Sequence, residues 1–237
     1  MNNEGQKLLN GVFRAFMANN ANLFNATRLA PTEKEHIEIY HRFINPPHNA
    51  LIVDLGCGSG ECGHLLQGID PSLRIVNVVN NDALINLMEG LGRVCLNASF
   101  EATGLESEIA DVVMFNESIG YGNIDVAFKE AHRVLKSNGI LTIKDFSITD
   151  PKSIFSYLHD WGYVIHQPPT YIAAAYNNGF SIDQLIHPPI YTKHWFDIME
   201  KSDVARESAL KHDPKNLPLC TALYKFKKGN LSGVSVD

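Results

Sequence analysis

Basic residues are scarce in this sequence. The 237 residues include 20 Lys and Arg against 26 Asp and Glu, so the formal net charge is −6 and the isoelectric point is about 5.9. Proteins that bind nucleic acid usually present a basic face or have a high isoelectric point. The composition therefore disfavours a nucleic-acid partner.

Long apolar runs are also absent, and a membrane-spanning helix needs about 18 or more consecutive apolar residues. The segment Met1–Gly5 lacks the basic start of a signal peptide. The four cysteines form no Cys-x-x-Cys pair, and the spacing of His187 and His194 does not suit a helical metal pair. We therefore expect a cytoplasmic protein without a membrane span and without a metal site.

Short apolar runs alternate with segments of helical spacing. Strands are predicted over 50–53, 74–79, 94–96, 111–115, 140–146, 179–186 and 219–226, and helices over 61–67, 82–91, 125–135, 151–161, 169–178 and 192–209. Ser137-Asn138-Gly139 is expected to end the helix over 125–135 with a glycine cap. Alternation of this kind is typical of a parallel sheet wrapped by helices.

A glycine-rich turn follows the first predicted strand, with the sequence Asp54-Leu55-Gly56-Cys57-Gly58-Ser59-Gly60. Glycine permits positive φ and lets a ligand approach the backbone. The turn leads into a helix N-terminus with free N–H groups, and ligands of open parallel sheets bind at the carboxyl ends of the strands. We therefore expect a nucleoside cofactor here, with Asp54 fixing the loop or contacting a cationic ligand.

The same turn contains Gly58-x-Gly60-x-x-Gly63, which also matches the dinucleotide-binding pattern. Two features argue against a dinucleotide. An acid, Asp54, precedes the first glycine, and the second strand is followed by Asn80 and Asn81 where a dinucleotide ribose needs a carboxylate. A dehydrogenase is therefore the weaker alternative.

Val53 to Gly60 resembles the first motif of the class I S-adenosylmethionine-dependent methyltransferases, and the order of elements from about 50 to 146 is similar to that family too. The resemblance implies S-adenosylmethionine as the cofactor. It also implies an α/β fold with a Rossmann-like, seven-stranded methyltransferase sheet, N-terminal helices and a helical C-terminal insertion. We expect a single domain over 1–237, divided into a helical cap (1–48), a cofactor-binding core (49–150), substrate-side helices and final strands (151–227) and a tail (228–237).

The resemblance also assigns the cofactor-binding residues by their position. It implies contacts with the methionine part from Gly56, Cys57, Gly58, Ser59 and Gly60, with the ribose from Asn80 and Asn81, and with the adenine from Asn97, Ala98, Ser99 and Phe100. Asn97 stands where many relatives carry aspartate, and Phe100 is as compatible with core packing as with an adenine contact. Asp54 and Asn116 complete the expected set.

The strand over 111–115 is followed by Asn116-Glu117-Ser118-Ile119-Gly120-Tyr121, beside the expected cofactor loop. A buried carboxylate at Glu117 indicates a functional role, because burying an unpaired charge is costly. The alternative is that Glu117 pairs with a helix N-terminus or faces solvent.

This segment resembles one in geranyl diphosphate C-methyltransferases. Sterol C-methyltransferases have a related sequence at the same place. The resemblance implies methyl transfer to an alkene carbon, with Glu117 and Tyr121 as catalytic residues. Both groups suit a carbocation, and Glu117 suits the removal of a proton afterwards. The lack of an arginine cluster is a departure that puts a diphosphate acceptor in doubt.

We therefore expect a methyltransferase that acts on a small molecule, with an isoprenoid or other lipid-like acceptor as the first expectation. Because the sulfonium is already activated, positioning carries much of the rate. An RNA or protein methyltransferase and a non-catalytic nucleoside-binding module stay as alternatives. The N-terminal helices are as compatible with a homodimer contact as with a lid over the cofactor.

Overall fold

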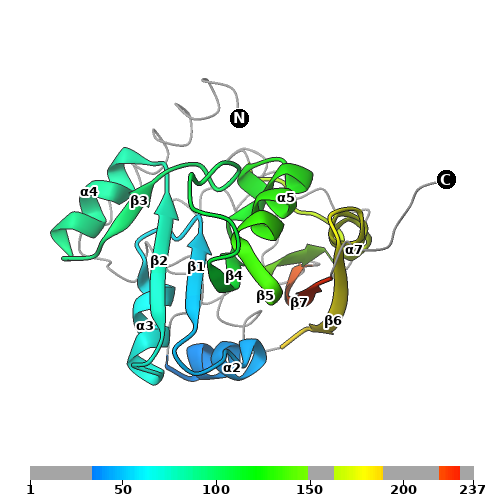
Figure 1. Cartoon of the computed structure of the whole chain (residues 1–237), viewed down its shortest axis with the longest axis horizontal. Coiled ribbons are helices and arrows are strands. Elements are labelled where there is room, and N and C mark those ends of the chain that lie inside the picture. The colour runs from blue at the N-terminus through cyan, green and yellow to red at the C-terminus, as the bar shows by residue number, and fades with distance from the viewer. Residues whose placement is uncertain (1–33, 149–162, 189–218, 230–237) are drawn as a thin grey trace.

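A seven-stranded sheet forms the centre of the protein in a computed structural model that describes residues 34–148, 163–188 and 219–229 (Figure 1). The strands lie in the order β3-β2-β1-β4-β5-β7-β6. Their bounds are β1 (Leu51–Leu55), β2 (Arg74–Val79), β3 (Cys95–Asn97), β4 (Ala110–Asn116), β5 (Leu135–Ile148), β6 (Phe180–Ile186) and β7 (Leu219–Lys228). The predicted fold class is confirmed.

The sheet is parallel from β1 to β5, whereas β7 runs antiparallel to both of its neighbours, β5 and β6. Apolar patterning does not encode strand direction, so the sequence did not reveal this reversal. β7 also continues to Lys228, two residues beyond the predicted end, so Lys228 belongs to the sheet and not to the expected tail. The parallel strands all place their carboxyl ends at one edge of the sheet.

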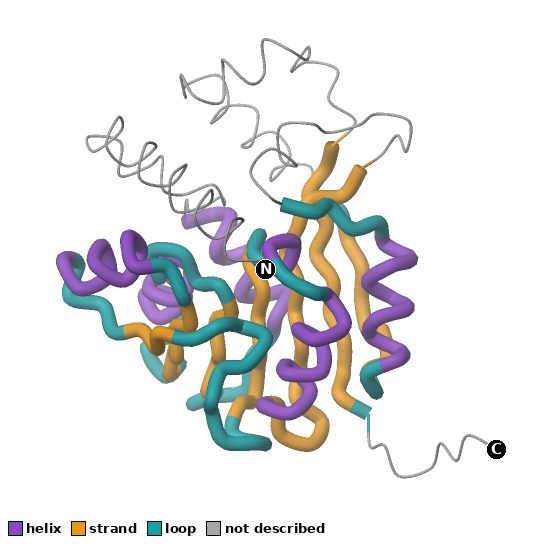
Figure 2. The backbone as a smooth tube through the Cα atoms, turned by 90° about the horizontal axis from the view of Figure 1, so that it is seen from above, coloured by secondary structure: helices purple, strands orange, loops and turns teal. Residues whose placement is uncertain are grey.

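Helices pack on both faces of the sheet (Figure 2). Their bounds are α2 (Lys34–Ile44), α3 (Glu61–Ile69), α4 (Asp82–Gly90), α5 (Ile124–Val134) and α7 (Pro168–Asn177), with a short 3-10 helix η1 (Ile119–Tyr121). α2 and α3 contribute Tyr40 and Leu66 to the core on one face, whereas α5 and α7 contribute Phe128 and Tyr171 to the core on the other. Within the described ranges, none of these helices is long and apolar enough to cross a membrane.

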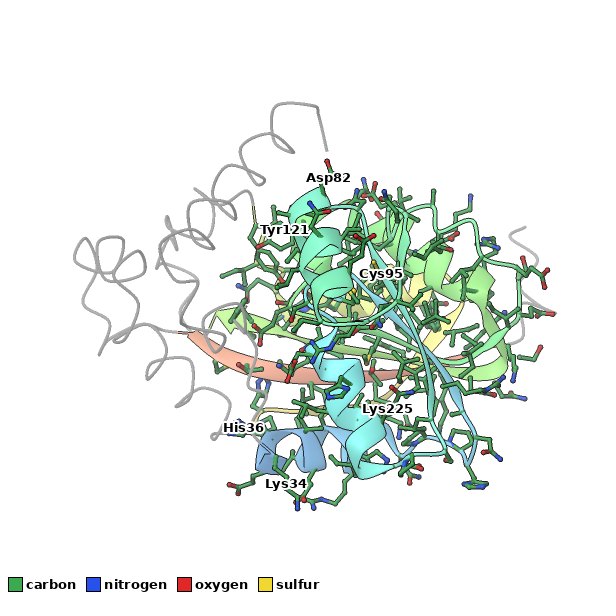
Figure 3. The ribbon with its side chains drawn as sticks, turned by 90° about the vertical axis from the view of Figure 1, so that its left-hand side faces the viewer. Lys34, His36, Asp82, Cys95, Tyr121 and Lys225 are labelled. Carbon is green, nitrogen blue, oxygen red and sulfur yellow. The ribbon has the colours of Figure 1, made fainter. Side chains whose placement is uncertain are left out.

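α2 lies within the predicted helical cap over 1–48, and Lys225 ties it to the sheet (Figure 3). The Lys225 ammonium donates a hydrogen bond to the carbonyl of Phe43, 3.2 Å away, in the last turn of α2. A cation is favourable at this end of a helix because the last carbonyls lack partners. The first 33 residues of that cap and the helices predicted over 151–161 and 192–209 lie outside the described residues.

The predicted glycine cap at Ser137-Asn138-Gly139 was wrong. α5 ends at Val134, and Leu135 already has extended backbone and pairs with Ala110 of β4. The next paired residues are Ile140 and Val112, so residues 136–139 form an irregular stretch opposite Asp111 alone. Asn138 takes the left-handed conformation there, with φ 64°. The turn residues were recognised correctly, but they interrupt a strand instead of ending a helix.

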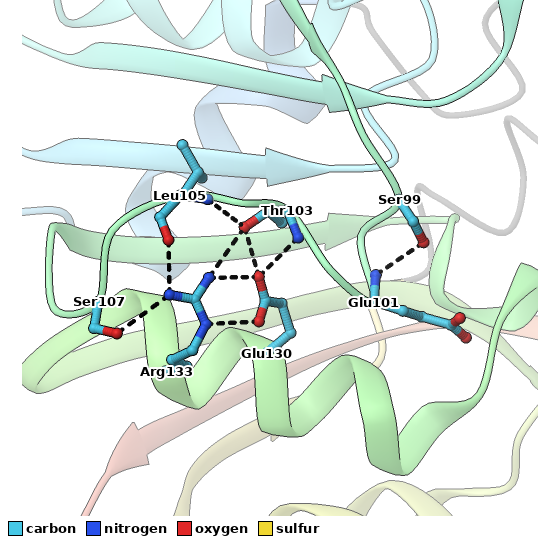
Figure 4. A network of polar contacts seen from close by, with 7 residues as sticks. All are labelled: Ser99, Glu101, Thr103, Leu105, Ser107, Glu130 and Arg133. Atoms are coloured by element: carbon cyan, nitrogen blue, oxygen red, sulfur yellow. Dashed lines mark hydrogen bonds and ion pairs between the residues drawn. The ribbon is translucent and has the colours of Figure 1, made fainter.

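The loop between β3 and β4 is anchored to α5 through Glu130 (Figure 4). The Glu130 carboxylate accepts hydrogen bonds from the backbone and hydroxyl of Thr103, at 2.8 and 2.5 Å, and pairs with Arg133. Arg133 also donates to the carbonyl of Leu105 at 2.7 Å. Burial by itself raises the pKa of Glu130, but the hydrogen bonds from Arg133 and Thr103 outweigh it and leave the pKa below its ordinary value.

Candidate cofactor and acceptor site

The predicted site residues gather at the carboxyl edge of the parallel strands. The glycine loop follows β1, Asn80 follows β2, Asn97 ends β3 and Asn116 ends β4. β1 lies between β2 and β4, and β3 lies beyond β2. The sheet order therefore brings together four segments that lie far apart in the sequence, at the edge where such sheets bind ligands.

The glycine loop depends on left-handed backbone at three positions. Gly56, Gly58 and Gly60 have φ of 75°, 58° and 69°. A Cβ at Gly56 would lie 2.5 Å from Cβ of Ser118, and a Cβ at Gly60 would lie 2.7 Å from Cε of Met88, whereas no atom of the described residues lies within 4 Å of a Cβ at Gly58. Gly56 is thus required by packing, and Gly60 is required by its left-handed backbone, because the Met88 methyl ends a flexible side chain that can move. Gly58 leaves open space for a ligand to approach the backbone.

Several neighbours hold the loop in place. The backbone N–H groups of Gly56 and Cys57 both donate to the carbonyl of Val78 in β2, at 2.9 and 3.1 Å. Ser118 donates from its hydroxyl to the carbonyl of Leu55 at 2.6 Å. The loop is therefore bonded to β2 and to the segment that follows β4, so its shape is set before any ligand binds.

Arg93, which the sequence analysis did not consider, bridges the loop and the helix after it. Its guanidinium donates to the carbonyl of Ser59 at 2.8 Å and forms an ion pair with Glu61 at 2.6 Å. The Cys57 thiol lies 3.8 Å from the sulfur of Met88, and burial raises its pKa. Cys57 is therefore a packing residue of the loop and is held as a neutral thiol.

Asp54 lies within β1 as its fourth residue and is completely buried. Neither of its carboxylate oxygens has a hydrogen-bond partner among the described residues. Burial raises the pKa of Asp54 to about 7, although the positive charge of Lys144 acts in the opposite direction. The carboxylate is therefore not explained by fixing the loop.

The two asparagines after β2 differ in their surroundings. The side-chain oxygen of Asn81 accepts hydrogen bonds from the backbone of Ala83 at 3.0 Å and Leu84 at 3.2 Å, and so caps the N-terminus of α4. Asn80 is exposed at the edge of the sheet. The cap accounts for Asn81 without a ligand, so Asn80 is the better placed of the two for a ribose.

The segment predicted for the adenine is only partly exposed. Asn97 is exposed, Ala98 and Phe100 are half-buried, and the Ser99 hydroxyl accepts a hydrogen bond from the backbone of Glu101 at 3.1 Å. The Phe100 ring packs edge-on against Phe115, with centroids 5.7 Å apart. Phe100 therefore contributes to the core, whether or not it also contacts a ligand.

Glu117 directly follows β4 and lies beside a buried lysine. Its carboxylate is 3.1 Å from the ammonium of Lys144, and both side chains are almost fully buried. Its backbone N–H donates to the carbonyl of Lys144 at 2.8 Å, and its own φ is 53°, a conformation that is uncommon for a residue with a side chain. Neither alternative in the sequence analysis, a helix N-terminus or solvent, describes this environment.

Tyr121 lies at the end of η1 and packs edge-on against Tyr163, with ring centroids 4.7 Å apart. Burial raises its pKa, and the charges of Asp145 and Glu117 add to the shift. Tyr163 donates a hydrogen bond to Asp145 at 2.5 Å, and Tyr171 of α7 donates to the other oxygen of the same carboxylate. The Tyr121 ring is thus positioned through Tyr163 and Asp145.

Lys144 and Asp145 were not among the predicted site residues. The signal was present, since these two charged residues stand inside the apolar strand run over 140–146. Charged residues are almost never fully buried unless they are paired. A lysine and an aspartate within a central strand therefore indicate buried partners elsewhere in the chain, here Glu117 and the two tyrosines. The described ranges contain no group of three or more His, Cys, Asp or Glu side chains that could hold a metal ion.

Comparison with known proteins gives one family match and one curated relative. Residues 53–143 match a family model described as a methyltransferase domain. The biotin biosynthesis bifunctional protein BioHC of Saccharophagus degradans is 31% identical over 124 residues, which cover 49% of this chain and 21% of that protein. The matched part of this chain thus spans about a fifth of the relative's length.

Solved structures with low sequence identity share the fold. A geranyl diphosphate methyltransferase in complex with S-adenosylmethionine has a TM-score of 0.69 and 16% identity, over 83% of this chain and 85% of that one. The geranyl diphosphate C-methyltransferase from Streptomyces coelicolor A3(2), solved with Mg²⁺, geranyl diphosphate and S-adenosylhomocysteine, has a TM-score of 0.70 and 15% identity, over 83% and 80%. A putative sarcosine dimethylglycine methyltransferase from Galdieria sulphuraria has a TM-score of 0.68 and 16% identity, over 83% and 85%.

Proposed function

On the premise that residues 53–143 form a methyltransferase domain, we propose that this chain transfers a methyl group from S-adenosylmethionine to a small-molecule acceptor. The family match confirms the predicted enzyme class, and structural neighbours solved with S-adenosylmethionine or S-adenosylhomocysteine agree with the predicted cofactor. The acceptor and the roles of individual residues belong to the proposal.

The glycine loop is the observation that carries the proposal. Its three left-handed glycines lie at the carboxyl edge of the sheet, and Gly58 leaves open space above the backbone. Gly56 to Gly60 would hold the methionine part of the cofactor, Asn80 the ribose, and Asn97 to Phe100 the adenine. The cofactor supplies an activated methyl group, so the protein's own residues have to orient the acceptor and exclude water.

An isoprenoid or other lipid-like acceptor is the first candidate. The buried Glu117 carboxylate and the Tyr121 ring lie on the segment that follows β4, and both suit an acceptor that becomes cationic when an alkene carbon takes the methyl group. The Lys144 ammonium lies 3.1 Å from Glu117, and a carboxylate at this place suits both the stabilisation of a cation and the later removal of its proton. Two structural neighbours act on geranyl diphosphate.

Calorimetric titration with S-adenosylmethionine, S-adenosylhomocysteine and NADH tests the cofactor. We expect both sulfur nucleosides to bind and NADH not to bind. Gly58→Arg fills the open space and should weaken binding at least about tenfold, or roughly 1.4 kcal/mol. Gly104→Arg is the matched control, because Gly104 also has positive φ and open surroundings but lies outside the loop. Tighter binding of NADH than of either sulfur nucleoside would identify a dinucleotide site and favour a dehydrogenase.

Methyl transfer to geranyl diphosphate and to geraniol, followed by mass spectrometry, tests the acceptor. Because the sequence lacks an arginine cluster, we expect geraniol to be methylated at least as well as the diphosphate. Glu117→Gln should slow the reaction by about 10²- to 10⁴-fold, the usual range for a catalytic acid or base, whereas the exposed Glu106→Gln should not. Cofactor binding without transfer to either compound would reject this acceptor class alone.

The similarity to the biotin biosynthesis protein supports a second candidate, an acceptor from that biosynthesis. Expression of this chain in a biotin-requiring bacterial mutant that lacks the relative's function tests it. Growth without biotin would favour this candidate over the isoprenoid, and dependence on added biotin would remove it.

A further inference from the structure

Asp54 is a buried carboxyl group whose own neighbourhood does not satisfy it. The residue is fully buried, and both of its oxygens are without a hydrogen-bond partner in the described part of the chain. It lies two residues before the glycine loop, on the face of the sheet that α2 and α3 cover, together with Cys62 and Lys144. Placing an unsatisfied carboxylate there is costly, so a group that arrives with the ligand is the natural partner.

The cation that acts on Asp54 is Lys144, which also lies beside a second carboxylate. Lys144 of β5 faces Asp54 and also pairs with Glu117, so two carboxylates stand against one ammonium. Glu61 of α3 is already compensated by Arg93 at 2.6 Å. Ionised Asp54 therefore shares the positive charge of Lys144 with Glu117, and a cationic ligand would stabilise the ionised form further.

Other titratable groups lie on the elements packed around Asp54. α2 contributes the buried His36 and Tyr40, and the Tyr40 hydroxyl lies 3.1 Å from that of Thr142. α3 and the loop contribute the thiols of Cys62 and Cys57, whose pKa values are raised chiefly by burial and next by Asp54 itself. The thiols therefore stay neutral.

We propose that Asp54 makes the site respond to the charge on the ligand's sulfur, so that ionised Asp54 favours S-adenosylmethionine over S-adenosylhomocysteine. The inference rests on the proposed function. When the acceptor's electron pair forms the new bond to the methyl carbon, the sulfur–carbon bond breaks and its electron pair stays on sulfur. The sulfonium thereby becomes a neutral thioether, so the spent cofactor keeps its ammonium and carboxylate but lacks the positive charge on sulfur.

Because ligand binding and the ionisation of Asp54 are coupled, the affinity for the cofactor depends on pH. Burial raises the pKa of Asp54 to about 7, so the group is part protonated at neutral pH before binding. A cationic ligand lowers that pKa and binds more tightly as the pH rises, whereas a ligand with neutral sulfur does so less. If S-adenosylmethionine lowers the pKa by one unit more, its preference over S-adenosylhomocysteine grows about fivefold between pH 6 and pH 8.

Calorimetric titration of the unmodified protein with both nucleosides at pH 6, 7 and 8 measures this preference directly. Repeating the pH 7 titrations in two buffers of different ionisation enthalpy counts protons, and we expect S-adenosylmethionine to release about 0.4 proton more than S-adenosylhomocysteine. A preference independent of pH, or equal proton release, would overturn the inference and leave the proposed function intact. Absence of binding by either nucleoside would overturn both.

Asp54→Asn assigns the effect to this residue, because it keeps the shape and removes the charge. The pH dependence and the extra proton should disappear in Asp54→Asn and persist in Asp111→Asn, whose carboxylate pairs with Lys136 at 2.8 Å and has a lowered pKa. Asp145 is a second buried carboxyl with a pKa raised to about 7. A pH dependence that survives in Asp54→Asn would assign the effect elsewhere and overturn the inference. The proton count on the unmodified protein decides the question if the variant does not fold.

Discussion

Two glycines of the same loop give a prediction at the scale of single residues. Gly56→Ala and Gly58→Ala both place a side chain at positive φ, which costs roughly 1–2 kcal/mol. Only Gly56→Ala also drives its Cβ to 2.5 Å from Cβ of Ser118. We expect urea unfolding to show a clearly larger loss for Gly56→Ala. Equal losses would mean that Ser118 moves aside without cost.

Glu130 gives a second prediction at this scale, because Thr103 and Arg133 both depend on its carboxylate. Glu130→Ala should lower the free energy of unfolding at pH 7 by about 2–3 kcal/mol, since donors to a buried charged acceptor are left unpaired. The pKa of Glu130 is lowered, so its contribution is present above its unfolded-state pKa and is lost as the pH falls through the folded-state value. Denaturant unfolding from pH 7 to pH 3 should therefore bring Glu130→Gln and the parent protein closer together, and Glu106→Gln serves as the exposed control.

At the scale of elements, Asn81 and Asn123 offer a matched pair. Each caps a helix by accepting two backbone hydrogen bonds, Asn81 at α4 and Asn123 at α5. Replacing either by Ala should cost about 1 kcal/mol of unfolding free energy, and replacing it by Ser should restore most of that loss. Calorimetry on the same variants separates stability from function: weaker cofactor binding in Asn81→Ser but not in Asn123→Ser would give Asn81 a ribose contact besides its cap.

The sequence predicted the elements better than their ends and partners. Apolar periodicity located every described strand and the helices α3, α4, α5 and α7, because burial of one face is a local property of the chain. The boundary between α5 and β5 was predicted wrongly. An apolar residue such as Leu135 suits a buried helix or a buried strand equally, and only its pairing with Ala110 makes it part of the strand. The glycine loop was found because glycine spacing is visible in sequence. The pairing of Glu117 with Lys144 was not, because it depends on the neighbouring positions of β4 and β5.

At the scale of the whole molecule, the two buried carboxyl groups predict how stability varies with pH. Asp54 and Asp145 ionise near pH 3.8 in the unfolded chain and near pH 7 in the folded one. Their contribution is fully present below the unfolded-state pKa and is lost as the pH rises toward the folded-state value. Between pH 5 and pH 8, Asp54→Asn should gain roughly 3 kcal/mol of unfolding free energy relative to the parent protein. Chemical unfolding of both proteins at each pH measures this, and a constant difference would show that Asp54 is ionised throughout.

The place of β7 between β5 and β6 affects how the sheet forms during synthesis of the chain. β7 fills the slot between β5 and β6, so the central sheet is not continuous until residues 219–228 are available. On a ribosome that synthesises from the N-terminus, β1 to β5 emerge first and leave the edge of β5 without a partner. An unpaired strand edge is a template for association with other chains. The edge of β5 is therefore open to such association until the last strand of the sheet is available.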